Sequence, residues 1–160
     1  MTIAVGDKIP SAKLKTMTAE GPKDISTDEI FGGKKVVLFA LPGAFTPTCS
    51  AKHLPGFVEK AAQIRDKGVA TIACLAVNDA FVMGAWAKQQ NTDGKILMLA
   101  DGSATFTKQL GLELDLTGPG MGIRSKRYAM VVDNGVVKAL NVEAPGAFEV
   151  SSADAILKAL

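Results

Sequence analysis

The 160-residue chain is poor in the side chains that build metal centres and disulfide scaffolds. It has two cysteines, Cys49 and Cys74, and a single histidine, His53. Two cysteines at positions 49 and 74 are too few and too widely spaced to form a disulfide framework or the ligand set of a zinc site. With one histidine, a metal site built by this chain would also be short of nitrogen and sulfur ligands. We therefore expect no metal and no cofactor.

The chain also lacks a strong net charge and a long apolar run. Its formal net charge is +2, and Lys and Arg occur only in short groups such as Lys34–Lys35 and Arg124–Arg127, so we expect no nucleic-acid partner. The longest apolar run, Val36–Leu41, is far too short to cross a membrane. The N-terminal residues lack the charged and then apolar pattern of a signal peptide. We expect a protein of the cytoplasm with no membrane association.

What the chain does contain is the composition of an ordinary globular domain. Its hydrophobic fraction is 48% and its charged fraction 21%, both usual for soluble domains. No internal repeat, low-complexity tract or linker interrupts the sequence. A chain of this length can bury one sizeable core. We expect a single domain over residues 1–160.

Strand and helix patterns alternate along the chain. The segments expected to form strands are Val36–Leu41, Val69–Val77, Ile96–Ala100, Tyr128–Asp133 and Val136–Leu140, the last two joined by the hairpin signal Asn134-Gly135. The segments expected to form helices are Pro47–Lys67, Asp79–Gln90, Ser103–Leu110 and Ser152–Leu160. This order predicts an α/β fold in which helices flank a central mixed β-sheet, and a thioredoxin-like arrangement fits it.

Several local features refine this picture. Asn78 or Asp79 is expected to cap the second helix, and the spacing of Ser151 and Asp154 predicts a capping box for the last one. Phe81, Met83 and Trp86 are expected to pack against the core from the second helix. The glycine-rich stretch Gly111–Arg124 is expected to be a long loop of functional or interfacial use.

The most informative stretch surrounds Cys49. An apolar strand ends at Leu41, a Pro-Gly turn follows, and a helix is expected to start with Thr46 as its N-cap and Pro47 as its first residue. Cys49 then lies in the first turn, where unpaired N–H groups and the helix dipole stabilise a thiolate. This pattern favours a reactive cysteine over a merely structural one.

The same stretch excludes two other kinds of cysteine chemistry. Thr46-Pro-Thr-Cys49 has a hydroxyl where a dithiol oxidoreductase has its second thiol. A cysteine hydrolase needs a histidine base with an orienting partner. His53 lies one helical turn after Cys49 and could pair with it, but a role in helix packing or at the surface is the stronger interpretation.

At these residues the chain resembles the peroxiredoxins. Pro42-x-x-x-Thr46-x-x-Cys49 is similar to their active-site motif, and Pro-Gly-Ala-Phe-Thr-Pro-Thr-Cys-Ser followed by His-Leu-Pro-Gly-Phe is similar to the type II subfamily, which includes the fifth mammalian peroxiredoxin. The resemblance extends to about Leu160. It implies a thiol-dependent peroxidase that reduces hydrogen peroxide and organic hydroperoxides through a cysteine sulfenic acid.

The resemblance also implies a role for each matching residue. Cys49 corresponds to the peroxidatic cysteine, Thr46 to the threonine that bonds peroxide and thiolate, and Pro42 to the proline that shields the sulfur from water. Arg127 corresponds to the active-site arginine, with Arg124 as the neighbour most easily mistaken for it. A guanidinium keeps its charge at working pH, and a hydroxyl both donates and accepts, so both suit these roles.

A sulfenic acid must condense with a second thiol. Cys74 is the only other cysteine, and its strand-like surroundings predict a buried structural residue. Ser151 lies in the region where some relatives have a resolving cysteine. We therefore expect a one-cysteine mechanism, and the resemblance implies glutathione with glutaredoxin, or thioredoxin, as the reductant.

The resemblance also implies a homodimer. A peroxide-sensing redox relay protein is the alternative function, and a non-catalytic binding module fits the motif poorly.

Overall fold

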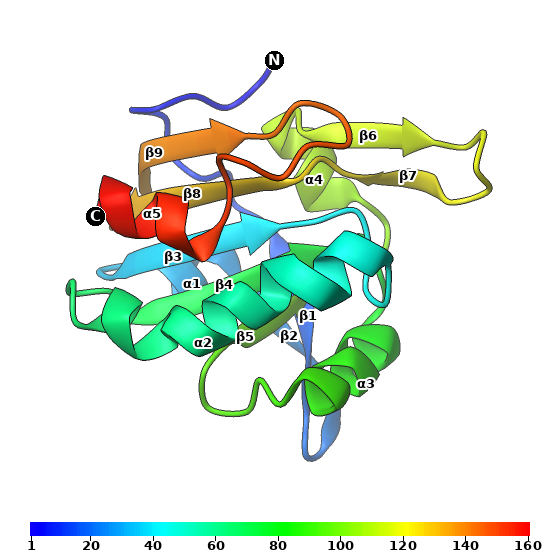
Figure 1. The fold of residues 1–160 in the computed structure, drawn as a ribbon, viewed down its shortest axis with the longest axis horizontal. Helices are drawn as coiled ribbons and strands as arrows, with labels where there is room; N and C mark the ends of the chain where they lie inside the picture. The colour runs from blue at the N-terminus through cyan, green and yellow to red at the C-terminus, as the bar shows by residue number, and fades with distance from the viewer.

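A computed structural model describes residues 1–160, which contain a seven-stranded mixed sheet (Figure 1). The strand order is β2-β1-β5-β4-β3-β8-β9, with β3, β4 and β5 parallel and the other pairings antiparallel. A separate two-stranded antiparallel sheet contains β6 and β7. The strands are β1 (Lys13–Thr18), β2 (Gly21–Ser26), β3 (Lys35–Ala40), β4 (Thr71–Ala76), β5 (Leu97–Ala100), β6 (Glu113–Leu116), β7 (Gly122–Ser125), β8 (Tyr128–Asp133) and β9 (Val136–Val142).

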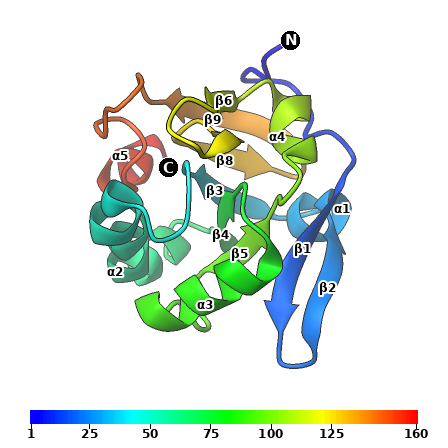
Figure 2. The same ribbon diagram turned by 90° about the vertical axis from the view of Figure 1, so that its right-hand side faces the viewer.

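Helices cover both faces of the large sheet, as Figure 2 shows edge-on. One face carries α2, α3 and α5, and the other carries α1 and α4. The helices are α1 (Thr27–Phe31), the π-helical segment η1 (Cys49–His53), α2 (Leu54–Arg65), α3 (Ala80–Gln90), α4 (Thr105–Leu110) and α5 (Ala153–Ala159). Because both faces are covered, the central strand β3 is apolar from Val36 onward instead of alternating.

The strands and helices that the sequence predicts are present close to their expected bounds, and the predicted α/β architecture is confirmed. The parallel pair β3 and β4 is joined through α2, as expected of a βαβ unit. Asp79, not Asn78, caps α3, since its carboxylate accepts from the Val82 N–H. None of the helices is both long and apolar enough to cross a membrane.

Three expectations are wrong. The stretch Gly111–Arg124 is not a continuous loop, because it contains β6 and most of β7. The cap of α5 is Ser152, whose hydroxyl accepts from the Ala155 N–H, while Ser151 is buried and bonded elsewhere. Phe81 does not pack in the core, since 68% of its surface is exposed, whereas Met83 and Trp86 are buried as predicted.

Both edges of the large sheet have features that hinder pairing with a further strand. The N-terminal segment runs along β9, where Gly6 donates to the Val137 carbonyl and Val137 donates to that of Asp7. At the other edge, β2 contains Pro22 together with exposed charged residues. The β1–β2 hairpin itself was not anticipated from the sequence pattern, because these strands are short and half-exposed.

Candidate active site

The first turn of the helix that follows β3 carries Cys49. Pro47 is its first helical residue, so Cys49 takes the third position, as the sequence predicts. From Cys49 to His53 the backbone is π-helical, and the Leu54 N–H donates to the Cys49 carbonyl five residues before it. Pro55 comes next; it has no N–H to donate and its ring crowds the preceding turn, which gives a physical reason for the wider turn.

The buried sulfur of Cys49 is contacted by Arg127, the residue immediately before β8. Nη2 of Arg127 donates to Sγ across 3.1 Å, and Nη1 lies 2.9 Å from Nδ1 of His53. The exposed fraction of Cys49 is 0%. A guanidinium held against a sulfur in so dry a place stabilises negative charge on the sulfur, and on an oxygen that approaches it.

The turn before the helix is fastened from two sides. Nη1 of Arg124, from β7, donates to the Pro42 carbonyl at 3.1 Å, and the Asn78 amide oxygen accepts from the Ala44 N–H at 2.9 Å. A side chain at Gly43 would displace Arg124 from its place, because an added Cβ would lie 2.5 Å from Nη1 of Arg124. Arg124 therefore braces the turn and Arg127 contacts the sulfur, so the two arginines have separate tasks.

Thr46 lies at the N-cap position but does not cap the helix with its side chain. Its hydroxyl donates to the Gly43 carbonyl at 2.7 Å, and the backbone carbonyl of Thr46 accepts from the Ser50 N–H at 2.9 Å. The hydroxyl oxygen keeps its lone pairs. Thr46 and Pro42 thus belong to the same braced turn that leads into Cys49.

His53 is fully buried between Arg127 and the chain before α5. Its Nε2 lies 2.9 Å from the Ser151 carbonyl. An arginine can only donate and a carbonyl can only accept, so Nε2 carries the proton and Nδ1 accepts from Arg127. Burial, together with the charge of Arg127, lowers the pKa of His53 to about 3. The imidazole is therefore neutral over the physiological pH range.

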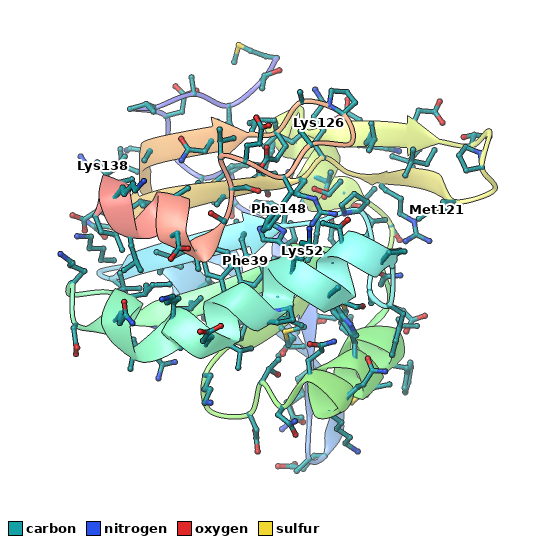
Figure 3. The ribbon with its side chains drawn as sticks, viewed as in Figure 1. Phe39, Lys52, Met121, Lys126, Lys138 and Phe148 are labelled. Carbon is teal, nitrogen blue, oxygen red and sulfur yellow. The ribbon has the colours of Figure 1, made fainter.

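The carboxylate of Glu143, just after β9, accepts several hydrogen bonds from the segment that ends at Ser151. It accepts from the N–H groups of Glu149, Val150 and Ser151 and from the Ser151 hydroxyl, at distances of 2.7 to 3.0 Å. Burial opposes ionisation of this carboxyl, but the hydrogen bonds outweigh it and lower the pKa of Glu143. Phe148, between these residues, packs its ring on His53, and Figure 3 shows Phe148 and Phe39 on the sheet face that α2 covers.

A cavity of about 160 Å³ opens beside Arg127, and Cys49 itself does not line it. Pro42 and Thr48 line it on the side of the active-site turn, and Lys126 and Arg127 line it on the side of the sheet. Residues 143–147 form the rest of the wall together with Leu114. A small reactant that enters this cavity meets the guanidinium that holds the Cys49 sulfur.

The chain was compared with known proteins. The Redoxin family model matches residues 4–157. Peroxiredoxin-2E-2 of rice (Oryza sativa subsp. japonica), a chloroplastic protein, is 54% identical over 164 residues, which cover 99% of this chain and 73% of the rice protein. Peroxiredoxin-2B of Arabidopsis thaliana is 50% identical over 99% of this chain and 98% of its own length. The chain belongs to the type II peroxiredoxins.

Solved structures agree with this assignment. The reduced Prx3 of Vibrio vulnificus, solved in complex with H2O2, superposes with a TM-score of 0.95 at 59% identity, over 99% of each chain. This peroxiredoxin therefore has the thioredoxin-like fold predicted from its sequence and is a thiol-dependent peroxidase.

The four residues that the sequence singles out meet in one place. Cys49, Thr46 and Pro42 come from the turn after β3 and the helix start that follows it; Arg127, just before β8, contacts Cys49 and lines one cavity with Pro42. Three further contributors were missed or underrated: His53 was expected mainly to pack or to face solvent, with pairing to Cys49 as the weaker alternative, and Glu143 and Phe148 carried no expectation. The signal that could have indicated Glu143 and His53 is the likeness to the family of residues 137–143 and of the stretch His-Leu-Pro-Gly-Phe.

Proposed function

We propose that this peroxiredoxin reduces hydrogen peroxide and organic hydroperoxides with Cys49 as its only catalytic thiol. The thiolate attacks one peroxide oxygen, the O–O bond breaks, and the other oxygen leaves as hydroxide or alkoxide, which takes a proton to become water or an alcohol. Cys49 becomes a sulfenic acid. The observation that carries this proposal is the 3.1 Å bond from Arg127 to the Cys49 sulfur.

In this mechanism the residues around Cys49 divide the work. Arg127 stabilises the charge that spreads over sulfur and both oxygens as the O–O bond breaks. The Thr46 hydroxyl, half-buried at the entrance to the turn, turns from the Gly43 carbonyl toward the peroxide. Pro42 shields the sulfur from water; its ring lies in the cavity wall and its carbonyl is held by Arg124.

The sulfenic acid is reduced by a thiol from another molecule. Cys74 is fully buried in the middle of β4, where burial raises the pKa of its thiol and keeps it un-ionised. Such a thiol is a poor nucleophile. Ser151 has no thiol, and its hydroxyl is engaged by Glu143. These features favour glutathione with glutaredoxin, or thioredoxin, as the source of electrons.

An external thiol needs access that the reduced site does not give. Cys49 has no exposed surface, so the turn that carries it has to open before a bulky reductant reaches its sulfur. The π-helical hydrogen bonding of η1 departs from the α-helical pattern of α2, and such turns are frequent at functional sites. We propose that opening begins there after oxidation.

We also propose that the protein works as a homodimer in a reducing compartment such as the cytoplasm. Phe81, at the start of α3, and Phe45, in the active-site turn, expose 68% and 49% of their surfaces. Large apolar side chains exposed near a site favour an interface. Two cysteines that are both free suit a compartment that keeps thiols reduced.

A peroxide-sensing relay is the second candidate. It would form the same sulfenic acid but pass the oxidation to a partner protein. The buried position of Cys49 is as compatible with a relay as with an enzyme, because either function requires the turn to open before a partner thiol reaches the sulfur. The two differ in turnover: a relay is oxidised once by peroxide and does not cycle with a small thiol system.

Two experiments test the proposal. Stopped-flow mixing of reduced protein with hydrogen peroxide is expected to show rapid oxidation that Cys49→Ser abolishes; a wild type no faster than a free thiol would overturn the peroxidase mechanism. Turnover is then measured with glutathione plus glutaredoxin and with thioredoxin. Cys74→Ala is expected to keep full turnover. If the folded variant lost turnover with every reductant, the one-cysteine mechanism would be overturned.

A further inference from the structure

The orientation of Arg127 is not set by its contact with Cys49 alone. A guanidinium lies at the end of a flexible stem, and only a defined rotation points Nη2 at the sulfur. Two further contacts define that rotation. Nη1 donates to His53 Nδ1 at 2.9 Å, and the Phe148 ring lies 5.8 Å from the guanidinium carbon. A cation is attracted to an aromatic face at this distance.

His53 is suited to orienting this arginine because it accepts without carrying charge. A carboxylate in the same place would compete with the thiolate for the positive charge of Arg127. A neutral imidazole fixes the direction of one N–H and leaves the cation to the sulfur. Three aromatic rings hold the imidazole itself: those of Phe39, Phe57 and Phe148, with centroids 5.1 to 5.7 Å from its own.

The contacts of His53 close into a ring of hydrogen bonds. Nε2 of His53 donates to the Ser151 carbonyl, and Ser151 donates to the Glu143 carboxylate through its N–H and hydroxyl. The Glu143 backbone N–H in turn donates to the Arg127 carbonyl at 2.9 Å. The backbone and the guanidinium of Arg127 are thus tied to the same four-residue ring of Arg127, Glu143, Ser151 and His53.

We propose that His53 is the positioning residue for Arg127, and that the Glu143–Ser151 segment acts through it to hold the guanidinium on the Cys49 sulfur. The proposal rests on the peroxidase function of Cys49. His53 touches neither the sulfur nor the peroxide in this scheme. Its substitution lowers the rate by letting the guanidinium rotate away, and a displacement of about 1 Å in such a site costs up to about 100-fold in rate.

The test compares two substitutions of His53 that differ in the acceptor they offer. His53→Leu has none, whereas an amide oxygen in His53→Asn lies near the place of Nδ1. Each reduced variant is mixed with hydrogen peroxide and, separately, with iodoacetamide, and the loss of the Cys49 thiol is followed in a Cys74→Ala background. Alkylation needs the thiolate but has no O–O bond to break, so it corrects for changes in thiolate content or access.

We expect His53→Leu to slow the peroxide reaction about ten-fold or more, and at least about five-fold more than alkylation, as for loss of an aligned donor. His53→Asn is expected to recover most of that loss. Thr107→Val is the control: it removes a buried hydroxyl that donates to Asp101 from α4, on the opposite face of the sheet, and its peroxide rate is expected to stay within about two-fold of wild type.

Three results would overturn the proposal: a folded His53→Leu that reacts at the wild-type rate, a His53→Asn as slow as His53→Leu, or equal losses with both reagents. Where His53→Leu does not fold, Glu143→Leu disturbs the ring from its far end, because it leaves the Ser151 N–H and hydroxyl without their acceptor. It is expected to slow the peroxide reaction several-fold, and a wild-type rate would overturn the proposal. A wild type that is itself slow with peroxide defeats the peroxidase function instead.

Discussion

The guanidinium of Arg127 donates one N–H to the sulfur of Cys49 and another to the imidazole of His53. The two acceptors lie four residues apart on the helix, and the donor lies just before β8, more than seventy residues later in the chain. The planar guanidinium of Arg127 therefore links the reactive thiol, through His53, to the chain before α5. Its geometry depends on two nitrogens that point in fixed directions.

Replacing Arg127 by Lys tests whether the reaction needs both of these hydrogen bonds. A lysine has one nitrogen on a flexible stem and cannot serve both acceptors with the same geometry. We expect Arg127→Lys to slow oxidation of Cys49 by hydrogen peroxide about 100-fold or more. The control is Lys126→Ala, which removes an exposed cation next to Arg127 that contacts neither acceptor. If both variants were equally slow, local charge alone would explain the effect.

The contact between Gly43 and Arg124 predicts a non-additive pair of substitutions. A methyl group at Gly43 would lie 2.5 Å from Nη1 of Arg124, so Gly43→Ala is expected to cost about 1–3 kcal/mol of stability. Once Arg124→Ala removes the guanidinium, the methyl group has room. The double variant is therefore expected to be more stable than the sum of the single effects by at least about 0.5 kcal/mol, measured by urea unfolding. Strict additivity would mean that the turn is strained for another reason.

The buried imidazole makes stability fall as the pH falls. The pKa of His53 is about 3 in the folded protein and 6.5 in an exposed chain, so below pH 6.5 the unfolded chain binds a proton that the folded protein refuses. Arg127 and Glu143 are the charged groups that face this ring. Between pH 7 and 5.5 we expect a loss of about 1 kcal/mol. Urea unfolding at the two pH values measures it.

His53→Leu supplies the control for this pH effect. His53 is the only histidine in the chain, and carboxyl groups titrate mostly below pH 5.5. The free energy of unfolding of the variant is therefore expected to be nearly flat between the two pH values. A variant that loses as much stability as the wild type over this range would assign the effect to another group.

Tyr128 offers a stabilising substitution. Its ring and hydroxyl are fully buried, the hydroxyl has no hydrogen-bond partner, and burial raises the pKa of this phenol well above its usual value. Because an unpaired buried hydroxyl costs free energy, Tyr128→Phe is expected to stabilise the fold by about 1 kcal/mol in urea unfolding. Tyr128→Leu, which leaves space unfilled, is expected to destabilise it. A destabilised Tyr128→Phe would show that the hydroxyl has a partner.

Local sequence signals predicted the half of the site that is local in sequence. The buried strand, the Pro-Gly turn and Pro47 as the first helical residue place Cys49 without any long-range information. The contacts of His53 are different, since Arg127 and Ser151 lie 74 and 98 residues away. A histidine between Lys and Leu shows no pattern that indicates a buried acceptor, and its role emerges only from the packing.

The weaker predictions share a physical cause. In β6 and β7 the alternation is short and the residues are half-exposed, so glycines dominate the pattern and favour a loop. Phe81 follows the helical period of apolar residues but points outward. Periodicity cannot distinguish a side chain that packs on its own core from one that is left for another surface. Ser151 and Ser152 are adjacent and chemically alike, so spacing alone could not choose the cap.

The two edges of the large sheet limit how copies of the molecule can associate. β2 contains Pro22, which has no N–H to offer, and the exposed Lys23 and Asp24, while the N-terminal segment occupies the N–H and C=O of Val137 in β9. Strand-by-strand growth into fibres needs an open row of N–H and C=O groups at an edge. With β2 blunted and part of β9 covered, adding a strand from another copy to this sheet is hindered, so contacts between crowded copies rely more on side-chain surfaces.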